Sequence, residues 1–228
     1  MSRLTETIAA LEARSEARIR DGIGRYGITT ADRVLGVPMA GIQAVGKAIG
    51  RDHQLAEALW QSGVYEARLL AAFVDDPALV TPAQMDRWTR QFDNWGTCDT
   101  LCFKLFDQSP HGFDMVDRWA GDPAEFVRRS AFALLASLAL HDRKSGDGPF
   151  LSRLPLIEAA AGDDRNFVWK GVSWALRAIG GRRSPVLRAA ADDLAERLAA
   201  SPERSARWIG KEAVKAFAKA TERRSSKG

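Results

Sequence analysis

A tryptophan and an aspartate stand four residues apart in the segment 92–99, where an apolar helical pattern begins. Because four residues make about one helical turn, Trp95 and Asp99 are expected to project from the same side of that helix. The pattern is the i, i+3, i+4, i+7 stripe of a buried helix, and Asp99 lies roughly 110° from its centre. The stripe consists of Cys98, Leu101, Cys102 and Leu105. Such a pair is either a solvated or capping Asp beside a core Trp, or a functional site.

A second tryptophan stands between two cations in the segment 166–179. Its helical pattern has an apolar stripe of Val168, Val172, Ala175, Leu176 and Ile179. At about 100° per residue, Trp174 falls roughly 145° from that stripe, with Lys170 and Arg177 beside it. Trp174 could pack against a neighbouring helix. Alternatively, it could contact a base or sugar in a basic groove, where the two cations would neutralise phosphates.

Two adjacent arginines, Arg128 and Arg129, stand near the start of the predicted helix 124–140. Cations at this end of a helix oppose its dipole, so an anionic partner is expected to compensate them. That partner could be a ligand, or it could be Asp99. The nearly uncharged run that follows predicts a buried face, formed by Phe132, Leu135 and Leu138.

Composition limits the possible classes of protein. The chain has 228 residues, is 46% hydrophobic and carries a net charge of +4, which favours a packed core and fits nucleic acid or no particular partner. Its two Cys and three His are too few for a convincing zinc site, so we expect neither metal nor cofactor. Both Cys fall on the apolar stripe and indicate buried thiols in a reducing cytoplasm. Residues 1–20 have no signal-peptide core, and no apolar run reaches the ~20 residues of a membrane span.

Sustained alternation of apolar and polar residues is missing, so the sequence predicts an all-α protein. Thr81, Pro82 and Gln84 form the strongest start signal, with an N-cap Thr followed by Pro at the first helical position. The predicted helices cover residues 2–22, 38–49, 55–61, 65–74, 82–92, 95–106, 113–120, 124–140, 150–161, 163–179, 184–200 and 201 onward.

A short motif recurs along the chain, with two apolar residues, a polar one, a basic one, a small one and an apolar one. It begins at Val64, Phe126, Phe167 and Trp208. The basic positions Arg129, Lys170 and Lys211 are spaced by about 40 residues, which is typical of HEAT-like repeats with two helices each. We therefore expect a helical-repeat solenoid of antiparallel helix pairs in one domain, 1–220, with a concave groove and a basic flexible tail, 221–228. An irregular helical bundle is the alternative.

Four segments together resemble the DNA alkylation repair family, the AlkD-like glycosylases built from HEAT-like repeats. They are Gln84-Met85-Asp86-Arg87-Trp88, Phe92-Asp93-Asn94-Trp95-Gly96-Thr97-Cys98-Asp99, the segment 125–132 and the segment 166–177. The resemblance extends from about Gly36 to Phe217 and keeps the order and spacing of the motifs. It implies hydrolysis of the N-glycosidic bond of cationic alkylated purines, such as 3-methyladenine and 7-methylguanine, in double-stranded DNA.

Carried over by motif, Asp99 looks like the catalytic carboxylate, and Trp95 and Trp174 like the aromatics that hold the damaged nucleotide. Arg129 looks like the cation that contacts the DNA backbone, and Tyr26 is the nearest candidate for the family's N-terminal aromatic. Further DNA contacts are expected from Arg128, Lys170 and Arg177. The resemblance implies a monomer acting on DNA that contains alkylated bases, without a membrane, in the cytoplasm and on the nucleoid.

Two other functions fit the same helices. The first is a non-catalytic HEAT-like protein that binds branched or distorted DNA, since the family contains members without glycosylase activity. The second is a HEAT-like protein scaffold with no DNA role, against which the pI of 9.3 argues only weakly.

Overall fold

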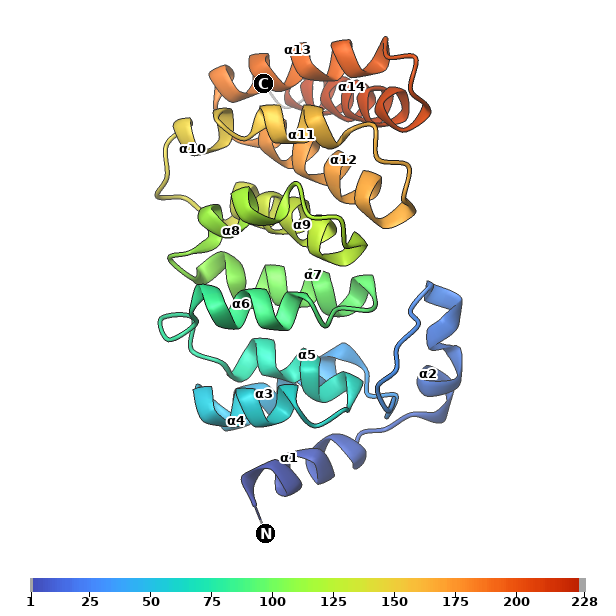
Figure 1. Ribbon diagram of the computed structural model, residues 1–228, viewed down its shortest axis with the longest axis vertical. Coiled ribbons are helices and arrows are strands. Elements are labelled where there is room, and N and C mark those ends of the chain that lie inside the picture. Colours follow the sequence, from blue (N-terminus) through green and yellow to red (C-terminus); the bar gives the residue numbers. More distant parts are fainter. Residues whose placement is uncertain (1, 226–228) are drawn as a thin grey trace. The chain divides into compact units, whose positions relative to one another are not determined.

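The computed structural model describes residues 2–225, with side chains to residue 222, and is built from helices (Figure 1). The all-α prediction is confirmed: within residues 2–225 no strand forms, and an isolated bridge joins Arg33 to Val64. In the same range, no helix combines the length and apolar character needed to cross a bilayer.

The helices divide into two compact units, Met1–His111 and Gly112–Gly228. This boundary falls inside the predicted domain 1–220, whose extent stays a prediction. The helices of unit 1 are α1 (Arg3–Glu12), α2 (Ala17–Gly22), η1 (Ile23–Tyr26), α3 (Met39–Ile49), α4 (His53–Trp60), α5 (Tyr65–Val74), α6 (Pro82–Thr89), α7 (Trp95–Lys104) and η2 (Phe106–Gln108).

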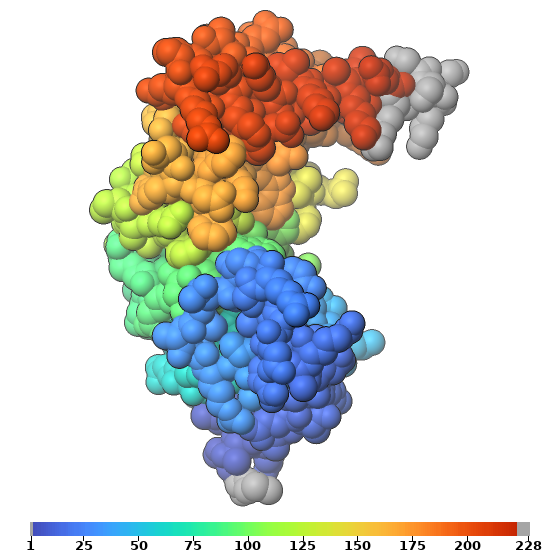
Figure 2. Space-filling view, turned by 90° about the vertical axis from the view of Figure 1, so that its right-hand side faces the viewer, coloured from blue at the N-terminus to red at the C-terminus, as the bar shows by residue number. Residues whose placement is uncertain are grey.

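The single helix predicted for residues 2–22 is wrong, because α1 ends at Glu12 and α2 begins at Ala17. Between them the chain turns so that the N–H of Glu16 donates to the carbonyl of Gly36 at 2.9 Å. Gly36 has φ +85°, and a Cβ there would lie 2.6 Å from the oxygen of Glu16. The chain bends at this close approach. Figure 2 shows the bent segment, which contains α2, at the front of unit 1.

A buried carboxylate anchors the connector that follows. Glu66, at the start of α5, is 2% exposed and accepts hydrogen bonds from three successive backbone N–H groups. The donors are Leu35, Gly36 and Val37, at 2.9, 2.7 and 3.2 Å. Because a buried carboxylate is costly without such donors, this nest fixes residues 35–37 against α5.

Helices α4 and α6 pack through aromatic rings. Trp60 and Trp88 stack with centroids 4.5 Å apart and planes 8° apart, and both are almost fully buried. The predicted start of α6 is confirmed, since the Thr81 side chain accepts the N–H of Gln84. The side chain of Gln84 does not complete a capping box and donates instead to the buried Asp75 at 2.7 Å.

The helices of unit 2 are α8 (Gly112–Trp119), α9 (Glu125–His141), α10 (Gly148–Leu151), α11 (Leu154–Ala160), α12 (Asn166–Gly181), α13 (Pro185–Ala199) and α14 (Arg204–Ser225). The predicted helix 150–161 is broken, because α10 ends at the C-cap Ser152 and α11 begins after the N-cap Arg153, with Pro155 in its first turn. At the other end, α14 covers residues 221–225 of the predicted flexible tail. The remainder of that tail, 226–228, lies outside the described residues.

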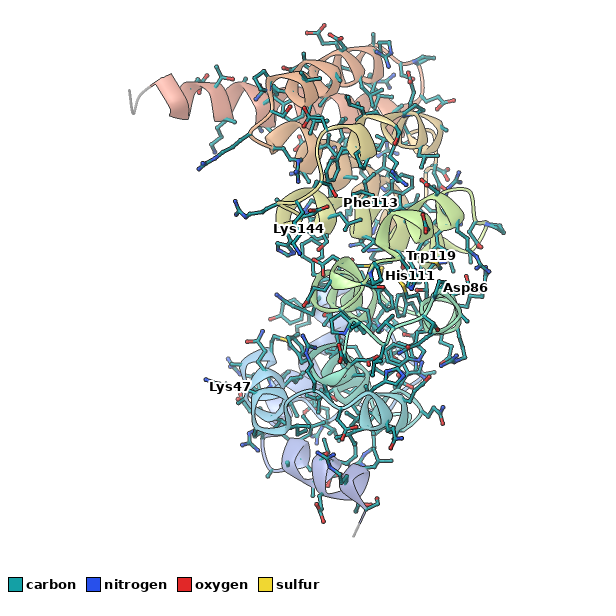
Figure 3. The ribbon with its side chains drawn as sticks, turned by 90° about the vertical axis from the view of Figure 1, so that its left-hand side faces the viewer. Lys47, Asp86, His111, Phe113, Trp119 and Lys144 are labelled. Carbon is teal, nitrogen blue, oxygen red and sulfur yellow. The ribbon has the colours of Figure 1, made fainter. Side chains whose placement is uncertain are left out.

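Helix α12 packs against α9, α11, α13 and α14 and forms the centre of unit 2. The predicted buried faces are confirmed, because Phe132, Leu135 and Leu138 of α9 are at most 4% exposed. The stripe of α12 predicted from Val168 to Ile179 is fully buried. On α8, Trp119 is buried, and Phe113 meets Phe150 edge to face at 5.4 Å (Phe113 and Trp119 are labelled in Figure 3).

Candidate nucleic-acid interface

Helix α7 places Trp95 and Asp99 at the rim of a buried face, as predicted. Asn94 caps the helix by accepting the N–H of Thr97 at 2.9 Å, so that Trp95 is the first helical residue. The stripe of Cys98, Leu101, Cys102 and Leu105 is fully buried. Trp95 and Asp99 are both half-buried and lie one turn apart. The capping role is therefore filled by Asn94, which leaves the Asp99 carboxylate at the edge of the helix.

Tyr26, the candidate N-terminal aromatic, is joined directly to this helix start. The indole Nε1 of Trp95 donates to the carbonyl oxygen of Tyr26 at 2.9 Å. The Tyr26 side chain is 72% exposed, and Gly27 ends η1 with φ +68°. The hydrogen bond orients the indole of Trp95 and brings Tyr26 beside it, although the two residues are far apart in sequence.

A second link holds the N-terminal segment to α7. The carboxylate of Asp93 accepts the N–H of Ala31 at 2.9 Å and the side-chain amide of Asn94 at 2.7 Å. Nearby, Asp32 forms an ion pair with Arg68 at 3.1 Å. Burial raises the pKa of Asp32, and the negative charge of Asp93 raises it further. The guanidinium of Arg68 lowers the pKa and so opposes both effects. These carboxylates therefore act chiefly as anchors of the segment that carries Tyr26.

Gly96 allows a tyrosine to approach the start of α7. A Cβ on Gly96 would lie 2.7 Å from the hydroxyl oxygen of Tyr65 and 3.2 Å from a methyl group of Ile28. Burial raises the pKa of Tyr65, and the charges of Glu66 and Asp93 add to this effect, so its phenol stays protonated. Tyr65 and Tyr26 both line a cavity of about 570 Å³, together with Arg18 and Arg25.

The two cysteines behave as predicted from the stripe. Cys98 and Cys102 are reduced, fully buried thiols. Burial raises the pKa of Cys102 well above its ordinary value, and the neighbouring Cys98 and the charge of Asp99 contribute to the same effect. A thiol held in this form is a poor nucleophile.

On α9 the two arginines are engaged by protein groups. Arg128 pairs with Asp163 at 2.9 Å and also donates to the carbonyl of Ala120 at 2.9 Å. Arg129 is 6% exposed, donates to the carbonyl of Phe167 at 2.7 Å and lies 5.9 Å from the centre of that ring. Asp163 is thus an anionic partner of Arg128, and it is neither of the two partners, a ligand or Asp99, that the sequence suggested. The predicted contact of Arg129 with DNA stays a prediction.

On α12 the cations face outward. Lys170 and Arg177 are exposed, and Trp174 between them is half-buried. Steps of four and three residues place all three on one side of the helix, where the Arg177 guanidinium also donates to the carbonyl of Ser173 at 3.2 Å. We call Lys170, Trp174 and Arg177 the α12 face.

The predicted site residues thus fall into two groups, each within one unit. Trp95, Asp99 and Tyr26 come together in unit 1, and the α12 face forms in unit 2. Their convergence in one groove stays a prediction. Sequence reasoning missed the roles of Asp93, Tyr65 and Glu66, although Asp93 stands within the motif 92–99 and the other two begin the predicted helix 65–74.

Comparisons with known proteins support the assignment of the fold. No curated protein matches the chain. A solved structure described as "A new family of proteins related to the HEAT-like repeat DNA glycosylases with affinity for branched DNA structures" aligns with a TM-score of 0.77 and 18% identity, covering 92% of this chain and 94% of that one. A designed armadillo repeat protein aligns at 16% identity over 94% of this chain and 91% of that one, but its TM-score of 0.34 supports no conclusion.

The predicted HEAT-like helical-repeat fold is therefore confirmed, in place of an irregular bundle. The family model for the DNA alkylation repair enzyme matches residues 7–217, which include α7, α9 and α12 with the residues described above. The chain belongs to the DNA alkylation repair enzyme family.

Proposed function

We propose that this protein is a DNA glycosylase that hydrolyses the N-glycosidic bond of cationic alkylated purines in double-stranded DNA. The observation that carries the proposal is the start of α7, where Asp99 lies one turn from Trp95 and the Trp95 indole is held by the Tyr26 carbonyl. A carboxylate beside an oriented aromatic is the combination that such a reaction requires.

The chemistry needs little more than these groups. An N3- or N7-alkylated purine already bears a positive charge, so the bond from C1′ to the base nitrogen breaks with its electron pair moving to the base. The sugar then develops oxocarbenium character, which the negative charge of Asp99 stabilises. Water adds to C1′ and loses a proton, which leaves a neutral free base and an abasic site.

The aromatic residues favour the charged lesion. The faces of Trp95 and Trp174 attract a cationic base or sugar by cation–π contact, by about 1–2 kcal/mol each when water is excluded. The cations of the α12 face, Lys170 and Arg177, would neutralise phosphates. The side-chain amide of Asn94, beside Trp95, donates to Asp93 and Thr97. We therefore propose that recognition depends on charge and backbone more than on base sequence.

The decisive variant is Asp99→Asn, which keeps the shape of the side chain and removes its charge. We expect release of 7-methylguanine from methylated duplex DNA to fall by about a hundredfold or more, because the oxocarbenium loses its stabilising charge. Binding of the duplex should survive.

Asp86→Asn on α6 is the matched control, since it removes a carboxylate that pairs with Arg90. Figure 3 shows Asp86 and Lys47 on opposite sides of unit 1. Release by Asp99→Asn at the wild-type rate would refute the catalytic role.

The second candidate is a non-catalytic protein that binds branched or distorted DNA. It is favoured by the similar solved structure, whose family is described as having affinity for branched DNA structures. The same excision assay separates the two functions. A wild-type protein that binds a four-way junction tightly and releases no alkylated base would support this candidate over the glycosylase.

A further inference from the structure

A second aromatic cluster lies in unit 2, away from the α12 face. A cavity of about 650 Å³ opens where α12 and α14 begin, and Trp169 and Trp208 both line it. Both helices begin on the right-hand side of Figure 1, which is the side that faces the viewer in Figure 2. Neither tryptophan has a role in the glycosylase proposed above.

The two indoles form an open corner. Their ring centroids are 4.3 Å apart and their planes meet at 74°, so the edge of one ring points at the face of the other. Trp208 is 37% exposed and Trp169 is half-buried. Phe167, which is the motif equivalent of Trp208, packs on Phe126 at 5.2 Å, with the Arg129 guanidinium over the Phe167 ring. The first pair is thus covered by a cation, whereas the second pair borders an open cavity.

The charge around this corner is positive. Arg204, Arg207 and Lys211 line the cavity, against the single carboxylate of Asp164. Arg207 is held in place by donating to the carbonyls of Ser201 and Pro202, both at 2.9 Å. No acidic residue of α12 or α14 lies in the first turn of its own helix, although the Glu125 carboxylate accepts the N–H of Phe167 at 3.3 Å at the start of α12.

We propose that the corner of Trp169 and Trp208 binds an unpaired, undamaged nucleotide of DNA, with its base stacked on an indole and its phosphate paired with Lys211 or Arg204. The inference rests on the proposed action on DNA. A volume of about 650 Å³ lies in the range of ~300–1,000 Å³ typical of small-ligand sites. Stacking on an indole is available to every base, so the site has little base preference.

This corner is separate from the α12 face. Trp169 and Trp174 are five residues apart on α12, which corresponds to roughly 140° of rotation and about 7.5 Å along the axis. A nucleotide stacked on Trp169 therefore lies on a different side of α12 from a nucleotide held by Trp174. Binding at the corner would favour DNA that carries an extrahelical base over fully paired DNA.

The test compares two probes by fluorescence polarisation: a fully paired undamaged duplex and the same duplex with one extra, unpaired thymidine. We expect the wild-type protein to bind the bulged duplex about tenfold more tightly. Trp208→Ala should abolish that preference, Trp208→Phe should keep most of it, and Lys211→Ala should reduce it about threefold. Val186→Ala is the control, because Val186 is an exposed apolar residue on α13, at 57%.

Three further results separate the possible failures. Equal wild-type affinity for the two probes would overturn the inference and leave the glycosylase proposal intact if 7-methylguanine is still released. If Trp208→Ala lowers the melting temperature and weakens both probes equally, while Lys211→Ala has no effect, the tryptophan pair only packs α12 against α14. A wild-type protein that binds neither probe and releases no alkylated base would overturn both proposals.

Discussion

Helices α9 and α12 carry the same short motif at their starts, yet their cations have different environments. On α9, Arg129 is 6% exposed and bonded to the Phe167 carbonyl, and Arg128 is paired with Asp163. On α12, Lys170 occupies the position equivalent to Arg129 and is exposed. Equivalent positions in neighbouring repeats have therefore diverged. The α9 cations hold one repeat to the next, and the α12 cation is exposed to solvent.

The residue types fit this division. A guanidinium has five donors in a planar fork and suits a site where several carbonyl and carboxylate oxygens surround it. Arg128 meets two such oxygens, from Ala120 and Asp163. A lysine is a flexible point charge that suits a phosphate in solvent. Three predictions test whether stability and DNA binding separate in the same way.

Arg129→Ala should have the largest effect on stability. It removes a charged donor to the Phe167 carbonyl and leaves a space between α9 and α12, so we expect unfolding to become easier by about 2–3 kcal/mol. Urea denaturation measures this change. A stable variant whose DNA affinity alone falls, with a salt slope smaller by about one, would show instead that Arg129 contacts the backbone as the sequence predicts.

Asp163→Asn should have an intermediate effect that depends on pH. Hydrogen bonding from Arg165 chiefly, with the charges of Arg165 and Arg128, holds the pKa of Asp163 below its ordinary 3.8. The stabilisation is therefore fully present above pH 3.8 and is lost as pH falls through the lower, folded-state value. We expect a cost of about 1–2 kcal/mol at neutral pH.

Chemical denaturation of both proteins from pH 7 to pH 2 measures this effect. The difference between wild type and variant should be constant above about pH 5 and shrink in more acidic buffer. Asp192→Asn is the control, since its ion pair with Arg188 is more exposed and contributes little. A difference that grows on acidification would contradict the assigned direction of the pKa.

Much of this division could not be read from the sequence. Periodicity predicted the buried faces of α7, α9 and α12 correctly, because burial follows from spacing along one helix. Whether a cation on the remaining face is free depends on groups from other helices, which spacing does not reveal. The Phe167 carbonyl belongs to α12, and Asp163 belongs to the turn before α12. Nothing near Arg129 in the chain therefore signals its burial.

The candidate site also contains contacts between segments that spacing along one helix does not reveal. The motif 92–99 predicted Trp95 and Asp99 on one side of a helix. The contact of Trp95 with Tyr26 depends on a left-handed Gly27 and on the bend at Gly36, which no helical period predicts. Gly-rich segments adopt many conformations, and tertiary bonds from Asp93 and Glu66 select the observed one.

Lys170→Ala should have the smallest effect, confined to DNA binding. Lys170 is exposed, so its loss should leave the free energy of unfolding within about 0.5 kcal/mol of wild type. If it neutralises one phosphate, the dependence of log affinity on log salt should become shallower by about one unit, equally for damaged and undamaged duplexes. Arg197→Ala on α13 is the charge-matched control, because Arg197 is paired with Glu158 in an exposed ion pair. An unchanged slope for Lys170→Ala, together with a reduced slope for Arg129→Ala, would reverse the assignment of the two cations and make α9 the helix that contacts DNA.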